Sequence, residues 1–162
     1  MGHLKGQTKE QATQAFRSWL THIPPCDIIV YSDGSQQLFN GSLSSGAGWT
    51  ATQASKEIFR GCLPLGPYIE VYDAEVYAAK SGLEAALNFH SAKYADNIHI
   101  CLDNLEVASR LLSITTGSSQ NTFISFNSLT NQWPAHIREP FTQPGRVLIR
   151  WCPGHMNIPG NE

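Results

Sequence analysis

The chain has 162 residues, of which 41% are hydrophobic and 15% are charged, and its formal net charge is −2. This length suits one domain with a hydrophobic core, and the composition argues against a long disordered tail. The small net charge excludes a global electrostatic attraction to nucleic acid, so a nucleic-acid partner would need a local basic patch.

The cellular setting follows from what the sequence lacks. It has no signal peptide and no apolar run of membrane-spanning length. The four cysteines form no CxxC motif, and three of them lie in or beside apolar runs, which favours free thiols in a reducing compartment. We therefore expect an intracellular protein of the cytoplasm or nucleus, without a membrane partner.

The N-terminal half predicts one helix followed by three strands. Apolar residues at helical spacing indicate an amphipathic helix over residues 7–22, and two prolines end it. Residues 28–32 predict a strand and residues 34–44 a turn or loop. Two further strands over 46–53 and 56–64, with short links, suggest an antiparallel meander.

The C-terminal half alternates between helices and strands. The clearest helix covers residues 73–89, with Asp73 as a plausible N-cap. The remaining elements are a strand over 97–103, a short helix over 104–112, a helix within residues 121–138 that runs up to Trp133-Pro134, and a strand over 146–151. A meander followed by this alternation predicts an α/β fold, a mixed five-stranded sheet flanked by helices. We expect one domain over residues 26–162, preceded by a helical appendage over residues 1–25.

Three carboxylates occupy positions that this arrangement brings together. Asp33 and Asp103 each end a predicted strand, and Glu75 lies in the first turn of the long helix. Adjacent strands would place the two aspartates side by side, with the helix start over them. Each residue alone has a simpler structural explanation: Asp33 as a turn former, Glu75 as a favourable charge at a helix N-terminus, Asp103 as a helix cap.

The three carboxylates together favour a metal site. Crowded carboxylates raise each other's pKa values and stay ionised only when cations neutralise them. Oxygen-only ligands of this kind suit Mg²⁺ or Mn²⁺. Two such ions about 4 Å apart can cleave a phosphodiester by in-line attack of water.

Four segments resemble conserved motifs of type-1 ribonuclease H, the kind that is fused to the reverse transcriptases of retroelements. They are YSDGS (31–35), YDAEVYAA (72–79), CLDN (101–104) and RWCPGHMNIPGNE (150–162). The resemblance covers roughly residues 28–162. The helix before the first strand is similar to the segment that precedes this domain in fungal non-LTR retrotransposon polyproteins, which suggests a retroelement origin.

The resemblance implies hydrolysis of the RNA strand of an RNA–DNA hybrid. Asp33, Glu75 and Asp103 would bind two Mg²⁺ ions, with Mn²⁺ as a substitute. His155 occupies the position of the family's mobile histidine and would help to release product; a structural loop histidine is the alternative.

The resemblance also implies a surface for the hybrid. Ser35, Gln36 and Asn104 are candidates to contact its backbone and minor groove, where the 2′-hydroxyl distinguishes RNA from DNA.

The sequence departs from the family at its end. Family members continue after GNE to a fourth aspartate and a final helix, whereas this chain ends at Glu162. We therefore expect a C-terminally truncated domain with reduced activity. Two alternatives stay open: a catalytically impaired retroelement fragment that binds hybrid or a protein partner, and a structural α/β domain with fortuitous acidic strand ends.

Overall fold

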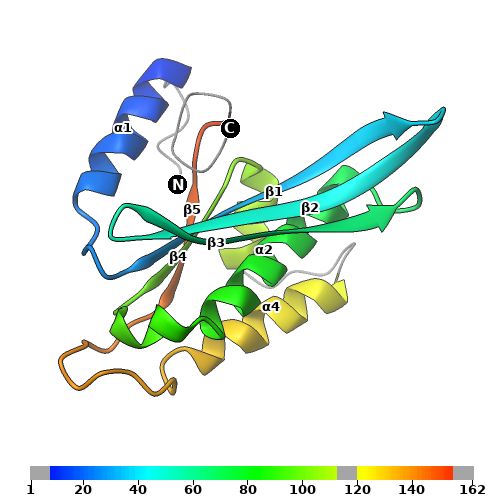
Figure 1. The fold of residues 1–162 in the computed structure, drawn as a ribbon. Coiled ribbons are helices and arrows are strands. Elements are labelled where there is room, and N and C mark those ends of the chain that lie inside the picture. The colour runs from blue at the N-terminus through cyan, green and yellow to red at the C-terminus, as the bar shows by residue number, and fades with distance from the viewer. Residues whose placement is uncertain (1–7, 113–119, 155–162) are drawn as a thin grey trace.

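The computed structural model describes residues 8–112 and 120–154 of the chain (Figure 1). Its helices are α1 (Lys9–Thr21), α2 (Val71–Leu87), the short 3-10 helix η2 (His90–Tyr94), α3 (Leu105–Leu112) and α4 (Gln120–Gln132). Its strands are β1 (Ile28–Phe39), β2 (Ser42–Gln53), β3 (Lys56–Gly66), β4 (Ile98–Leu102) and β5 (Val147–Trp151). No helix within the described ranges is long and apolar enough to cross a membrane.

The five strands form one mixed sheet in the order β3-β2-β1-β4-β5, which confirms the predicted architecture. β1, β2 and β3 are antiparallel neighbours, and β4 and β5 run parallel to β1. Asn40 and Gly41 link β1 to β2 with φ values of 51° and 79°. Tight turns with positive φ at both central residues match the twist of the flanking strands.

The first strand is much longer than the sequence indicated. The predicted strand over 28–32 is part of β1 but was too short, and the predicted loop over 34–44 was wrong, because β1 continues to Phe39 and β2 begins at Ser42. Ser35 pairs with Gly46 and Gln37 pairs with Ser44. The side chains of Ser35 and Gln37 are exposed. A strand without a buried apolar face lacks the alternation by which strands are recognised.

The main core lies between the sheet and the helices α2 and α4. The interior face of α2 is rich in alanine and packs on Val30 of β1 and Ile100 of β4. α2 begins at Val71, so the prediction that Asp73 caps this helix was wrong: Glu70 is the N-cap residue, and its side chain makes no cap hydrogen bond. Asp73 lies in the first turn instead, where its charge still favours the helix dipole.

The opposite face of the sheet carries α1 (Figure 1). Tyr31, which alternates with Val30 along β1, belongs to a second buried cluster with Phe16 of α1, Cys101 and Cys152. Thr8 begins this helix with a capping box, in which its hydroxyl accepts from the Gln11 N–H at 3.1 Å. The segment expected to precede the domain therefore packs directly on its sheet.

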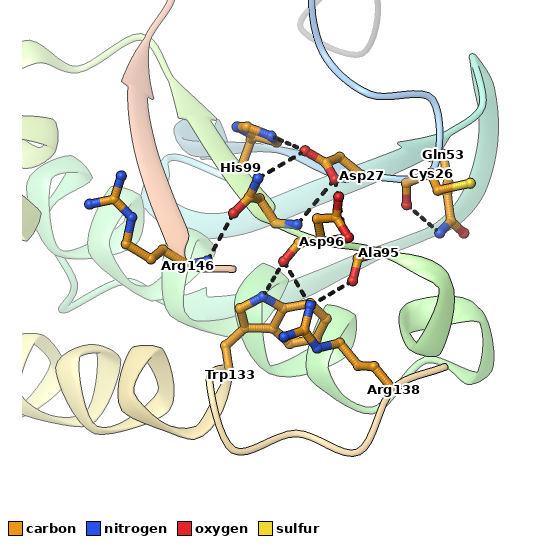
Figure 2. A network of polar contacts seen from close by, with 10 residues as sticks. Cys26, Asp27, Gln53, Ala95, Asp96, His99, Trp133, Arg138 and Arg146 are labelled. Carbon is orange, nitrogen blue, oxygen red and sulfur yellow. Dashed lines mark hydrogen bonds and ion pairs between the residues drawn. The ribbon is translucent and has the colours of Figure 1, made fainter. Parts of the chain in front are cut away.

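A polar network aligns the starts of the two central parallel strands (Figure 2). Asp27, just before β1, accepts hydrogen bonds from the backbone N–H groups of Asp96 and Asn97, at 3.2 and 3.1 Å. Its other oxygen lies 2.8 Å from Nε2 of His99 on β4. Because the starts of β1 and β4 are fixed to each other, their far ends are also held in register.

The segment after α4 closes the same end of the sheet. The helix predicted up to Trp133-Pro134 ends at Gln132, because helical geometry is disfavoured for the residue before a proline. The Trp133 indole N–H donates to the Asp96 carbonyl at 2.9 Å, and Arg138 donates to the carbonyls of Ala95 and Asp96 at 2.9 and 3.0 Å (Figure 2).

Gly34 of β1 tests how closely α2 approaches the sheet. A Cβ at Gly34 would lie 2.5 Å from the Glu75 backbone nitrogen, whereas a Cβ at Gly48 would meet nothing nearer than 3.9 Å. We expect Gly34→Ala to lower the free energy of unfolding by about 1–3 kcal/mol, as overpacking does. The matched Gly48→Ala should leave this free energy unchanged or raise it by about 0.5–1 kcal/mol. Urea denaturation measures both, and equal effects would contradict the close approach.

Candidate metal centre

The two aspartates lie where the sheet narrows. β4 pairs with β1 only as far as Tyr31 and Cys101, and Asp103 comes directly after the last residue of β4. Asp33 is not at the end of its strand, as the sequence suggested, but inside β1, two residues past the last pair with β4. The side of β1 that β4 leaves open is therefore where Asp33 and Asp103 meet.

Glu75 reaches the same place from α2. Gly34 has no side chain, so the backbone of β1 lies against Ala74 and Glu75. The Gly34 N–H donates a hydrogen bond to the Glu75 carboxylate. The close contact of strand and helix thus fixes the position and direction of this carboxylate.

The structure brings the three predicted carboxylates together. One oxygen from each of Asp33, Glu75 and Asp103 can be chosen so that all three lie within 4.8 Å of one another. Their burial differs sharply: Glu75 is only 4% exposed, Asp103 is half-buried and Asp33 is exposed. Glu75 therefore forms the buried side of the cluster, and Asp33 forms the side that is open to solvent.

Repulsion and burial change the acidity of Glu75. Desolvation, together with the negative charges of Asp33 and Asp103, raises the pKa of Glu75 to about 8, although the Gly34 N–H partly opposes this. Among the described residues, no lysine or arginine lowers this pKa. Without a cation, Glu75 is largely protonated at neutral pH.

The cluster fits a divalent cation. The Oε2 atom of Glu75 is buried and has no hydrogen-bond partner within the described part of the chain. All ligand atoms are carboxylate oxygens, the type that hard divalent cations prefer. A divalent ion would occupy the unpartnered oxygen and neutralise the repulsion.

The end of β5 and the residues after it hold Asp103 in place. The Trp151 indole N–H donates to the Asp103 carbonyl at 3.0 Å, and the Cys152 N–H donates to the Leu102 carbonyl at 2.9 Å. Gly154 lies so close that a Cβ there would be 2.5 Å from Oδ2 of Asp103. Burial, aided by the charge of Asp103, raises the pKa of the Cys152 thiol to about 12, so the thiol stays protonated.

Comparisons with known proteins find relatives in structure only. No family model matches the chain, and no curated protein matches it. Ribonuclease H1 from Halobacterium salinarum superposes with a TM-score of 0.57 at 17% identity, over 78% of this chain and 86% of that one. LC11 ribonuclease H1, isolated from compost and solved in complex with an RNA/DNA hybrid, gives 0.62 at 14% identity, over 82% and 90%.

A third match is to a part of a larger protein. The foamy viral protease-reverse transcriptase in complex with RNA/DNA hybrid has a TM-score of 0.60 at 14% identity, over 78% of this chain and 17% of that one. The chain has the ribonuclease H fold. At these identities the likeness establishes the fold alone.

Within this ribonuclease H fold, a groove of about 580 Å³ lies beside Asp33 on the three antiparallel strands. Ser35, predicted to contact substrate, lines this groove with Asp33. Gln36 alternates to the face of the sheet that carries α2, so it does not share the groove. Gln37 and Ser44 do line it, and sequence reasoning missed them because it placed both in a loop.

Asn104 does not line the groove. The side-chain oxygen of Asn104 accepts from the Val107 N–H at 3.0 Å, so Asn104 provides the helix cap that we had considered for Asp103. This contact leaves its predicted role at the substrate untested. His155 lies outside the described residues, and its role stays a prediction.

The acidity of Glu75 predicts how stability depends on pH without metal. Its pKa rises from an ordinary 4.5 to about 8 on folding, so the folded state binds more protons between these values. Stability should therefore fall as pH rises from 4.5 through 8, by up to a few kcal/mol for one such group. Urea denaturation in a chelator, at pH 5 and pH 8.5, measures this loss.

Glu75→Gln should remove most of this pH dependence, because the amide cannot ionise. Glu84→Gln, at an exposed carboxylate of the same helix, is the matched control and should behave as the wild type. A pH dependence that persists in Glu75→Gln would contradict the assignment to Glu75.

Proposed function

We propose that this chain is an endonuclease that hydrolyses the RNA strand of RNA–DNA hybrids, with Mg²⁺ or Mn²⁺ as cofactor. The observation that carries the proposal is the cluster of Asp33, Glu75 and Asp103 within one ribonuclease H fold. A fold-level likeness alone would not support an activity, because folds host many functions. The carboxylates supply the chemistry that this reaction needs.

Each carboxylate has a distinct part in the proposed site. Asp33, Glu75 and Asp103 would hold two divalent ions, which when bound activate water and stabilise the leaving oxygen. The Gly34 N–H orients the Glu75 carboxylate, and the Trp151 indole holds the backbone of Asp103. The exposed Asp33 leaves the cluster open to a phosphodiester on the protein surface.

The proton on Glu75 would make metal binding depend on pH. A divalent ion binds the ionised carboxylate, so it must displace the proton that burial and repulsion hold there. Metal affinity should therefore increase as pH rises towards 8.

Recognition of the hybrid is proposed to rely on neutral polar groups near the cluster. Ser35 in the groove, Gln36 next to it in the sequence and Asn104 next to Asp103 offer hydroxyl and amide groups that can bond to 2′-hydroxyls. None of the described residues that line the groove is a lysine or arginine, so phosphate attraction from them would be weak. His155 would assist product release. The retroelement origin and the intracellular location, in cytoplasm or nucleus, likewise remain proposals.

Metal should stabilise the folded chain. We expect millimolar Mg²⁺ or Mn²⁺ to raise the melting temperature at pH 7.5, because a ligand that binds only the folded state stabilises it. Glu75→Gln should melt higher than the wild type without metal and respond less to metal. A wild-type melting temperature that does not change with either ion would argue against an assembled metal site.

Cleavage tests the proposed reaction. A labelled RNA–DNA hybrid incubated with Mg²⁺ or Mn²⁺ should be cut in its RNA strand only. Asp103→Asn should reduce the rate by about 100-fold or more, in line with the loss of a group that stabilises charge in a transition state. Glu84→Gln, outside the cluster, should cut at the wild-type rate. Hybrid binding without cleavage in the wild type would instead indicate a non-catalytic binding module.

A further inference from the structure

The face of the sheet behind the two aspartates is covered by α1 (Figure 1). Tyr31 and Cys101 pair across β1 and β4, and each lies two residues before a carboxylate of the cluster, Asp33 and Asp103 respectively. Both are buried, at 3% and 1% exposure. On the face that carries α1, they are the last buried side chains of β1 and β4 before the three carboxylates.

Phe16 of α1 covers Tyr31 and Cys101 on this face of the sheet. Phe16 of α1 is 1% exposed and packs in one cluster with Tyr31, Cys101 and Cys152. Cys152 belongs to the segment that holds Asp103, since its N–H donates to the Leu102 carbonyl at 2.9 Å. Phe16 therefore contacts the supports of both aspartates.

Trp19, one turn further along α1, extends the same contact to β4 and β5. Its ring lies 5.3 Å from that of Phe16 and 5.4 Å, edge-on, from that of His99 on β4. The Arg150 guanidinium of β5 lies 4.8 Å from the Trp19 ring centre. α1 thus contacts β1, β4 and β5 on one face of the sheet, from the level of His99 to that of Cys101, which lies two residues before Asp103.

We propose that α1 is part of the metal centre's support, and that Phe16 and Trp19 are positioning residues for Asp33 and Asp103. This inference rests on the proposed metal site. The three carboxylates repel one another, and the packing of α1 behind them adds to the hydrogen bonds that keep the strand ends together. Groups that orient metal ligands without touching the ion control its affinity, because they fix the ligand geometry in advance.

A purely structural role for α1 makes a different prediction. If the helix only covered apolar surface, its substitution would lower the free energy of unfolding and leave the metal affinity of the folded protein unchanged. The two roles are therefore separated by measuring affinity in variants that remain folded.

The experiment is calorimetric titration of the full chain with Mn²⁺, well below the melting temperature, with circular dichroism to confirm folding. Trp19→Ala and the milder Phe16→Leu should each weaken Mn²⁺ binding by about 10-fold, the lower end of the effect of removing such supports. If Trp19→Ala does not fold, Phe16→Leu decides.

Two controls flank these variants. Gln14→Ala changes an exposed residue of α1. Phe126→Leu trims a buried ring of α4, which packs on the other face of the sheet. Both should bind Mn²⁺ with wild-type affinity, although Phe126→Leu should lower the melting temperature.

The inference is overturned if folded Phe16→Leu and Trp19→Ala bind Mn²⁺ as the wild type does, or if Phe126→Leu weakens binding as much as they do. These outcomes leave the proposed nuclease intact. A wild-type chain that binds no Mn²⁺ would instead refute the metal centre, and the inference with it.

Discussion

The buried carboxylate of Glu75 is the constraint on which the rest of the site depends. It is 4% exposed, and two further carboxylates lie close to it. Burial and like charge both disfavour its ionised form, and the Gly34 N–H compensates only in part. Without a bound cation, this arrangement does not increase the stability of the fold. Protonation of Glu75 or a bound cation relieves this repulsion, but only a cation does so while all three carboxylates stay ionised, and this supports the proposed metal-dependent function.

The three carboxylates come together because β4 pairs with β1 only along the first part of β1. β1 continues past Tyr31 without a partner on that side, and its open side accepts Glu75 from α2 and Asp103 from the end of β4. The network around Asp27 fixes the starts of the same strands, and α1 packs behind their ends. The carboxylates are thus held together by the sheet, by α2 and by the helix on the opposite face.

The sequence predicted the cluster and the sheet because both depend on local signals. Asp33 and Asp103 follow apolar strands, and a helix rich in alanine carries Glu75. It did not predict the polar half of β1, because Ser35 and Gln37 face solvent and show no apolar alternation. The cap of α2 was misplaced because tertiary contact between Gly34 and the helix backbone, rather than a capping side chain, positions this helix. The packing of α1 behind the site was also beyond local patterns, since it joins residues of four separate elements.

The most direct test of the central claim is to titrate the Glu75 carboxyl group itself. Carbon-detected NMR of the labelled chain would follow its ionisation with a chelator present and then with saturating Mg²⁺. We predict a pKa of about 8 without metal, and ionisation at much lower pH once Mg²⁺ is bound. A Glu75 that titrates near its ordinary value without metal, or that does not respond to Mg²⁺, would contradict it.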